Sequence, residues 1–247
     1  MRKNILIVLC PLLVLCFSSC VVVSFMHTDA VAGKGAPEKY EIKVGEYNRI
    51  KVEGGAWEIQ YYSAPSDTVT LEIQPNLREY FAAEVINGEL IVRNTKRINF
   101  YSKKSLFPVL TVSTPALSSL TITGACNFKT IDKIKTDTFK LEIRGAGDGK
   151  AELDVNSLKT NMSGAGSFEL FGKADNAEIK FGGAGELIAS SLQIREASVN
   201  FSGAGTIRIN CSEKLSIEAR GVGLVEYKGS PNLNLSTNGP VSIRKVN

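Results

Sequence analysis

The feature that most constrains this chain is a short tripeptide, Gly-Ala-Gly, that recurs at a nearly constant spacing. Exact copies begin at Gly145, Gly164, Gly183 and Gly203. Altered copies begin at Gly124, Gly221 and Gly239. Successive first glycines are 21, 19, 19, 20, 18 and 18 residues apart. Because self-similarity at such a period is the signature of stacked structural repeats, the sequence predicts a solenoid.

The residues that flank each tripeptide alternate between apolar and polar. Four positions before the first glycine of each copy stand Leu120, Leu141, Thr160, Ile179, Val199, Ile217 and Leu235. Apolar residues also dominate two and six positions before, and four positions after, this glycine. Alternation with a period of two indicates strands with one buried face. We therefore predict an all-β fold, a right-handed parallel β-helix-like solenoid with repeats of about 19 residues.

Glycine suits the corner between the two strands of a repeat, because it tolerates positive φ and close approach of another backbone. The predicted corner glycines are Gly124, Gly145, Gly147, Gly164, Gly166, Gly183, Gly185, Gly203, Gly205, Gly221 and Gly223. We expect the alanine between them to point inward, where a methyl group fits and a larger side chain would overpack. The alternative is a phosphate-binding loop, but no copy follows a known phosphate-loop pattern or opens a helix.

The stretch from 40 to 115 is less regular. It contains a strand-corner pattern at 50–56, alternating segments at 68–73 and 109–112, and a hairpin signal around Asn87-Gly88. Residues 94–107 are predicted to form a protruding basic and aromatic loop. We expect one domain over 40–247, with irregular opening turns at 40–115 that act partly as a cap, and regular repeats at 116–247, since an uncapped solenoid exposes an edge.

The N-terminus has the features of an export signal: Arg2 and Lys3, an apolar run, and small residues before Cys20. We expect a lipoprotein signal peptide at 1–19, a lipidated Cys20, and a flexible tether over 20–39. The alternative is an uncleaved anchor, since the apolar run continues to Met26 and about 22 residues can span a bilayer. Both place the domain in the cell envelope, with outer-membrane attachment, on the periplasmic side or at the surface, as our expectation.

The chain resembles the family described as putative auto-transporter adhesin, head GIN domain. The resemblance rests on the lipoprotein-like start, the opening strand at 47–52, the Asn87-Gly88 hairpin and the Gly-Ala-Gly copies, and it covers roughly residues 40–245. It implies a β-helix-like domain, often found in lipoproteins, without a known catalytic residue.

Few residues point to chemistry. The single histidine, His27, lies in the predicted tether, so Cys126 and Cys211 have no histidine to activate them. Four coils separate these two cysteines, which are predicted to be unpaired. The acidic residues Asp132, Asp137, Asp148, Asp154 and Asp175 stand at different offsets from their corners. We expect no metal and no cofactor. Removing Arg2 and Lys3 leaves 27 basic and 25 acidic residues, so nucleic acid is not an expected partner.

These observations predict a non-catalytic, adhesin-like envelope module that presents a β surface to a glycan or protein partner. The alternative is a carbohydrate-active enzyme, a lyase or hydrolase, built on a β-helix. Five aromatic residues of the irregular part are candidates for a surface patch, but we favour their burial in the cap: Trp57, Tyr61, Tyr62, Phe100 and Tyr101.

Overall fold

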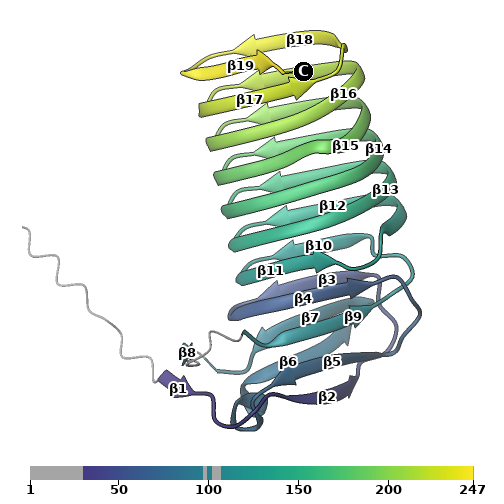
Figure 1. Ribbon diagram of the computed structural model, residues 1–247, viewed down its shortest axis with the longest axis vertical. Helices are drawn as coiled ribbons and strands as arrows, with labels where there is room; N and C mark the ends of the chain where they lie inside the picture. Colours follow the sequence, from purple (N-terminus) through teal and green to yellow (C-terminus); the bar gives the residue numbers. More distant parts are fainter. Residues whose placement is uncertain (1–29, 97–98, 102–106, 247) are drawn as a thin grey trace, which may run out of the picture.

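The computed structural model describes residues 30–96, 99–101 and 107–246, and this part of the chain is almost entirely β-strand. The strands stack as parallel coils into an elongated β-solenoid of about seven turns (Figure 1). The prediction of an all-β solenoid built from glycine-cornered repeats is therefore confirmed. No helix in the described ranges is long and apolar enough to cross a membrane.

Each regular coil has two sides. The strand before the glycine corner lies in one sheet, which we call face 1, and the strand after it lies in the other, face 2. Long strands bend around the opposite, rounded edge and so contribute to both faces (Figure 1). The strands of the regular part are β10 (Ser119–Ile122), β11 (Ala125–Thr130), β12 (Ile134–Ile143), β13 (Ala146–Met162), β14 (Ala165–Phe181), β15 (Ala184–Phe201), β16 (Ala204–Ala219), β17 (Val222–Lys228), β18 (Asn232–Thr237) and β19 (Val241–Lys245).

The coils lie in register, so that equivalent residues form columns along the solenoid. The alanine column runs through Ala56, Ala125, Ala146, Ala165, Ala184 and Ala204 and ends at Val222. Inside, apolar columns fill the space between the two faces with Phe128, Phe139, Phe168, Phe181 and Phe201 among the largest fully buried side chains. Phe181 and Phe201 stack in neighbouring coils, with ring centroids 5.4 Å apart.

The alanine of the tripeptide points outward, which corrects the expected inward ladder. Ala146, Ala165, Ala184 and Ala204 are all exposed. The reason is that the two-residue alternation continues through the corner without a break. Positions two and four before the first glycine face inward, so the glycines have the inward parity and the residue between them has the outward parity.

The corner glycines are needed because neighbouring backbones approach closely. A Cβ on Gly145 would lie 2.1 Å from the carbonyl oxygen of Gly124, and one on Gly166 would lie 1.8 Å from that of Gly147. Gly166 also has φ +136°, a conformation that side chains rarely adopt. Most other corner glycines repeat one of these two contacts with the previous coil, namely Gly124, Gly164, Gly183, Gly185, Gly203, Gly205, Gly221 and Gly223. Gly147 differs, because the two atoms nearest to a Cβ there would both be side-chain atoms, at 3.4 Å.

The coils at the N-terminal end do not stack in chain order. The coil of β3 (Arg49–Glu53) and β4 (Ala56–Tyr62) lies between two others. Below it lies the coil of β7 (Glu89–Asn94) and β9 (Val109–Ser113), and above it the coil of β10 and β11 (Figure 1). The second coil in the chain therefore lies beneath the first.

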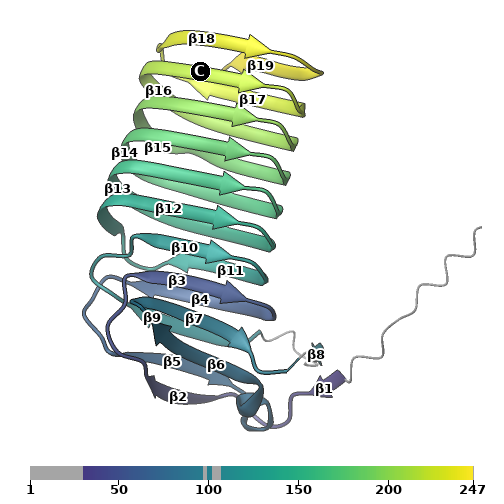
Figure 2. The ribbon, with the colours of Figure 1, turned by 180° about the vertical axis from the view of Figure 1, so that it is seen from behind.

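Antiparallel strands close this end. β2 (Glu38–Lys43) pairs with β5 (Thr68–Ile73), and β6 (Phe81–Ile86) pairs with β7, with the 3-10 helix η1 (Pro75–Tyr80) between β5 and β6 (Figure 2). The predicted Asn87-Gly88 hairpin joins β6 and β7. Asn87 has φ 52° and Gly88 has φ 74°, as a two-residue type I′ turn requires.

The segment predicted as a free tether is partly ordered. β1 (Ala30–Ala32) pairs in parallel with β8 (Asn99–Tyr101), a strand within the segment expected to be a loop. The side-chain amide of Asn76 donates to the carbonyl oxygen of Ala32 at 2.8 Å, and its oxygen accepts from the Lys34 N–H at 2.8 Å. These bonds attach residues 30–34 to the cap, because the Asn76 side chain satisfies a donor and an acceptor of that backbone.

Candidate interaction surfaces

Two of the five aromatic residues, Trp57 and Tyr61, are buried in the core, in agreement with the expected burial and not with a surface patch. Trp57 and Tyr61 are 1% and 0% exposed, because their side chains lie with that of Ile59 on the inward side of β4. Trp57 packs edge-on against Phe81, and the Tyr61 hydroxyl donates to the Thr114 carbonyl oxygen at 2.8 Å. The inward parity of the 56–62 segment was the signal that could have identified them as core residues. Tyr62 is half-buried.

Three further predicted residues lie outside what the structure describes in side-chain detail. The backbones of Phe100 and Tyr101 belong to β8, but their side chains are not described. Cys20, the predicted lipidation site, lies outside the described residues. Its lipidation therefore stays a prediction.

The edge of the solenoid at which the corner glycines lie, which we call the glycine edge, has the properties of a scaffold. Its backbone groups form hydrogen bonds that hold neighbouring coils together. The Gly164 N–H donates to the Ile143 carbonyl oxygen at 3.0 Å, and the Ala165 N–H donates to Gly145 at 2.9 Å. These amides are not free to bind an anion. The edge is hollowed near its N-terminal end into a cavity of about 280 Å³, lined among others by Ala56, Phe107, Asn127, Ala146, Asp148 and Ala165.

Face 2 carries an ion-pair cluster that spans successive coils near the C-terminal end. Glu226 accepts from Arg208 Nε at 2.8 Å and from Arg244 Nε at 3.0 Å. Arg208 also contacts Glu186 at 3.3 Å. Hydrogen bonds from Arg244 and Arg208 hold the pKa of Glu226 below its ordinary value. The cluster was missed in the sequence, although Arg208, Glu226 and Arg244 are spaced by the local 18-residue period.

Removing the carboxylate of Glu226 should make the protein less stable and less sensitive to acid. A carboxylate whose folded pKa is lowered stabilises the fold above its unfolded value of about 4.5, and this contribution is lost as the pH falls through the folded pKa. In Glu226→Gln we expect a lower Tm at about pH 7 and a smaller drop in Tm between about pH 7 and about pH 3. Glu46→Gln, at an exposed loop carboxylate, is the control. Equal pH dependence in wild type and Glu226→Gln would contradict the expectation.

A second buried carboxylate lies on face 1. Glu142 is 6% exposed and lies 3.0 Å from Lys140 Nζ and 2.6 Å from an Arg144 terminal nitrogen. Burial alone would raise the pKa of Glu142, but hydrogen bonds from Lys140 and Arg144 outweigh this and lower it. The pKa values of Glu58 and Glu178 are lowered too, first by hydrogen bonds from Lys129 and Lys180 respectively. A general acid for glycoside cleavage needs the opposite shift.

Four of the five acidic positions singled out in the sequence have neighbours other than a second acidic residue. Asp154 lies in register with Lys135 and Lys173 of the neighbouring coils, and Asp148 with Asn127. Asp137 accepts from the Asn156 side chain at 2.7 Å. Asp132 lies elsewhere, on the turn after β11, where it accepts from the Ser63 N–H at 3.1 Å. Within the described ranges, no group of three or more histidine, cysteine or acidic residues could hold a metal ion.

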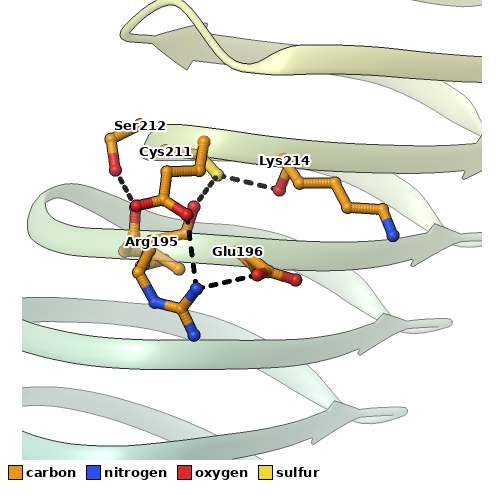
Figure 3. Close-up of polar contacts among 7 residues, drawn as sticks. Arg195, Glu196, Cys211, Ser212 and Lys214 are labelled. Carbon is orange, nitrogen blue, oxygen red and sulfur yellow. Dashed lines mark hydrogen bonds and ion pairs between the residues drawn. The ribbon is translucent and has the colours of Figure 1, made fainter.

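The rounded edge around Cys211 contains an irregularity in coil pairing. The register between β15 and β16 shifts between Ala189 and Gln193 and again between Ile194 and Glu196. Here the Cys211 sulfur lies 3.1 Å from the Lys214 carbonyl oxygen, and Arg195 lies 2.8 Å from Glu196 (Figure 3). The Cys211 thiol and the Arg195–Glu196 ion pair thus lie where the pairing of β15 with β16 is interrupted.

Neither cysteine of the described part is suited to act as a nucleophile. Cys126 and Cys211 are both free and buried, in β11 and β16. Burial raises the pKa of Cys126 to about 12 and also raises that of Cys211. Because the thiolate is the reactive form, both side chains serve packing.

A second cavity, larger than the one at the glycine edge, lies among loops of the N-terminal part. It has a volume of about 630 Å³ and is lined among others by Glu46, Tyr47, Pro65, Asp67, Thr114 and Pro115. Tyr47 is held there because its hydroxyl accepts from the Ser113 N–H at 2.9 Å, and burial raises its pKa to about 12. Asp67 is paired with Lys43 at 3.3 Å.

The fold and these surfaces define a β-solenoid whose outward side chains form polar rows on two long faces. The chain belongs to the family described as "Putative auto-transporter adhesin, head GIN domain", whose model matches residues 46–231. The resemblance inferred from the repeats is therefore confirmed. No match was found among curated proteins.

Solved structures share the fold. A structure described as a putative adhesin from Bacteroides fragilis is 23% identical, with a TM-score of 0.79, and the match covers 87% of this chain and all of that one. One described as a putative lipid binding protein from Parabacteroides distasonis is 24% identical, with a TM-score of 0.67 and coverage of 88% and 100%. A putative adhesin from the same species is 20% identical, with a TM-score of 0.68 and coverage of 88% and 100%.

Proposed function

We propose that this protein is a non-catalytic lipoprotein of the cell envelope, anchored through Cys20, whose solenoid binds a glycan or protein partner. Membership of the adhesin-named family supports an adhesin-like role that is not enzymatic. The observation that carries the proposal is the arrangement of outward-facing, exposed or half-buried side chains in straight rows, for example Ser119, Lys140, Lys159, Glu178, Ser198, Ser216 and Asn234 on face 1.

Such rows repeat at the coil spacing of ~4.8 Å on a rigid backbone. A repetitive partner can contact several coils at once, so that weak contacts add up. No observation favours the enzyme alternative, because the four carboxylates with a resolved pKa shift, Glu58, Glu142, Glu178 and Glu226, are all shifted toward the charged form.

The binding proposal is tested with the purified full chain on a panel of bacterial and host glycans and on protein-coated surfaces, with product analysis after incubation. We expect binding without release of sugars. Lys159→Glu on face 1 and Lys129→Glu on face 2 reverse the charge of one exposed lysine on each face, and Lys129 also loses its ion pair with Glu58. One of the two should weaken binding by roughly tenfold, because reversal replaces an attraction by a repulsion. Sugar release from any glycan would overturn the non-catalytic assignment.

The anchor is tested separately by growth with radiolabelled palmitate. Wild type should take up label and Cys20→Ala should not, because the lipid is attached at Cys20. Label in Cys20→Ala would contradict lipidation at this residue. An unlabelled wild type of uncleaved mass would instead support the signal anchor.

A further inference from the structure

The C-terminal end of the solenoid is an open edge. Within the described residues β18 pairs only with β16, and β19 only with β17, so each has one unpaired side (Figure 2). The inward side chains of this last coil are incompletely covered. Leu235 is 46% exposed, and Leu233, Val241 and Ile243 are only partly buried against the core. Unpaired strand edges with apolar residues between them favour pairing with another chain.

Two outer strands, β2 at the N-terminal end and β18 at the C-terminal end, differ in the charges that discourage such pairing. Within the described residues β2 pairs only with β5, and four of its six residues, Glu38, Lys39, Glu41 and Lys43, are charged. β18 has the sequence Asn-Leu-Asn-Leu-Ser-Thr and carries no charge. Charged side chains on edge strands are the usual protection against edge-to-edge contact. That protection is present in β2 and lacking in β18.

The charges of β19 do not close the edge either. Arg244 is held by Glu226 of the coil below, and Lys245 donates to the Ser230 hydroxyl at 3.2 Å. Both cations are thus turned to partners within the same molecule. A neutral strand and a strand with compensated charges together form the open surface.

We propose that the open edge binds a second copy of this chain, end to end and related by a twofold axis. β18 runs toward a corner and β19 away from it, so the edge presents two strands of opposite direction with apolar side chains between them. A twofold-related copy meets both strands antiparallel at the same time and covers the apolar residues. A single extended strand from another protein would pair with only one of the two edge strands, β18 or β19.

Side-chain parity fixes the register of the β18 pair. Leu233 and Leu235 must face the same core in both copies, and a shift of one residue would turn them outward. The antiparallel arrangement that pairs Leu233 with Leu235 of the second copy sets Asn234 opposite Asn234 of the second copy, on the outer side of face 1. Because a twofold axis uses the same edge of both copies, the contact closes as a dimer and does not propagate into a fibre.

The mass of the full chain in detergent solution, measured by light scattering after size-exclusion chromatography at about 100 µM, tests the dimer. We expect twice the polypeptide mass for wild type. Asn234→Glu sets like charges directly opposite each other and should give a monomer. The control Ser198→Glu lies in the same column of side chains, in β15, and should remain dimeric. A monomeric wild type, or a dimer that survives Asn234→Glu unchanged, overturns the proposal and leaves the edge to a strand of another protein.

A cysteine pair tests the register without weakening the contact. In Asn234→Cys the two introduced cysteines lie directly opposite each other, with Cβ atoms about 4.5–5.5 Å apart. They are therefore expected to form a disulfide after mild oxidation. We expect the tryptic peptide 229–244 to appear linked to itself in non-reducing mass spectrometry, which excludes other cysteines as its origin. Ser198→Cys should give no self-linked peptide 196–208. Equal self-linkage in both variants would indicate random collision and contradict the proposed register.

Discussion

Gly166→Ala is expected to destabilise the solenoid by roughly 4 kcal/mol or more, among the largest effects of a single methyl group. Its Cβ would lie 1.8 Å from the Gly147 carbonyl oxygen, and its φ of +136° is strained for any residue with a side chain. Neither problem can be relieved locally, because the neighbouring coil is held by backbone hydrogen bonds on both faces. The measurement is the urea midpoint followed by circular dichroism.

The matched control is Gly182→Ala, one repeat further along the same molecule. A Cβ there would meet only the Ser202 hydroxyl, at 3.4 Å, and no positive φ is involved. We expect a change within about 0.5 kcal/mol, or a slight gain from the stiffer unfolded chain. If both variants lost stability equally, backbone contact at the corner would not be the reason for glycine.

Phe201→Ala is expected to cost about 3–5 kcal/mol, since truncation of a buried phenylalanine removes its burial and leaves a cavity. Phe201 is fully buried and stacks on Phe181 of the coil below, with an interplanar angle of 14°. A double-mutant cycle with Phe181→Ala should give a coupling of about 0.5–1.5 kcal/mol, the typical value for an aromatic pair.

Phe171→Ala provides a comparison for the loss of stability in Phe201→Ala. Phe171 is half-buried on the outer surface, and Lys150 Nζ lies 5.2 Å from its ring centroid. We expect a loss of about 1 kcal/mol or less, in keeping with an exposed cation–π contact. A loss at Phe171 as large as that at Phe201 would show that the interior columns do not dominate stability.

The regular repeats could be predicted because their alternation and their corners recur in every copy. The same alternation, followed through the corner, would also have placed Ala146 and its equivalents outward and Trp57 and Tyr61 inward. What periodicity cannot supply is the order of neighbours. β3 has the pattern of an opening strand, but whether β7 or β10 lies against it depends on where the chain turns back, and both in fact pair with it.

The surfaces were less predictable than the core for a related reason. The ion-pair cluster of Glu226 depends on residues that are distant in sequence and adjacent only when coils are in exact register. The spacing of Arg208, Glu226 and Arg244 becomes meaningful once the local step of 18 residues is recognised. The docking of residues 30–34 through Asn76 has no repeated pattern at all, so only the folded chain reveals it.

The uniform corner contact has a consequence for how such molecules change in size. Since most layers of the regular part meet the next through the same glycine geometry, one such layer can be duplicated or lost without disturbing the fit of those that remain. Height then varies in increments of ~4.8 Å. Relatives with different numbers of layers would then hold the two ends of the solenoid at different distances from each other.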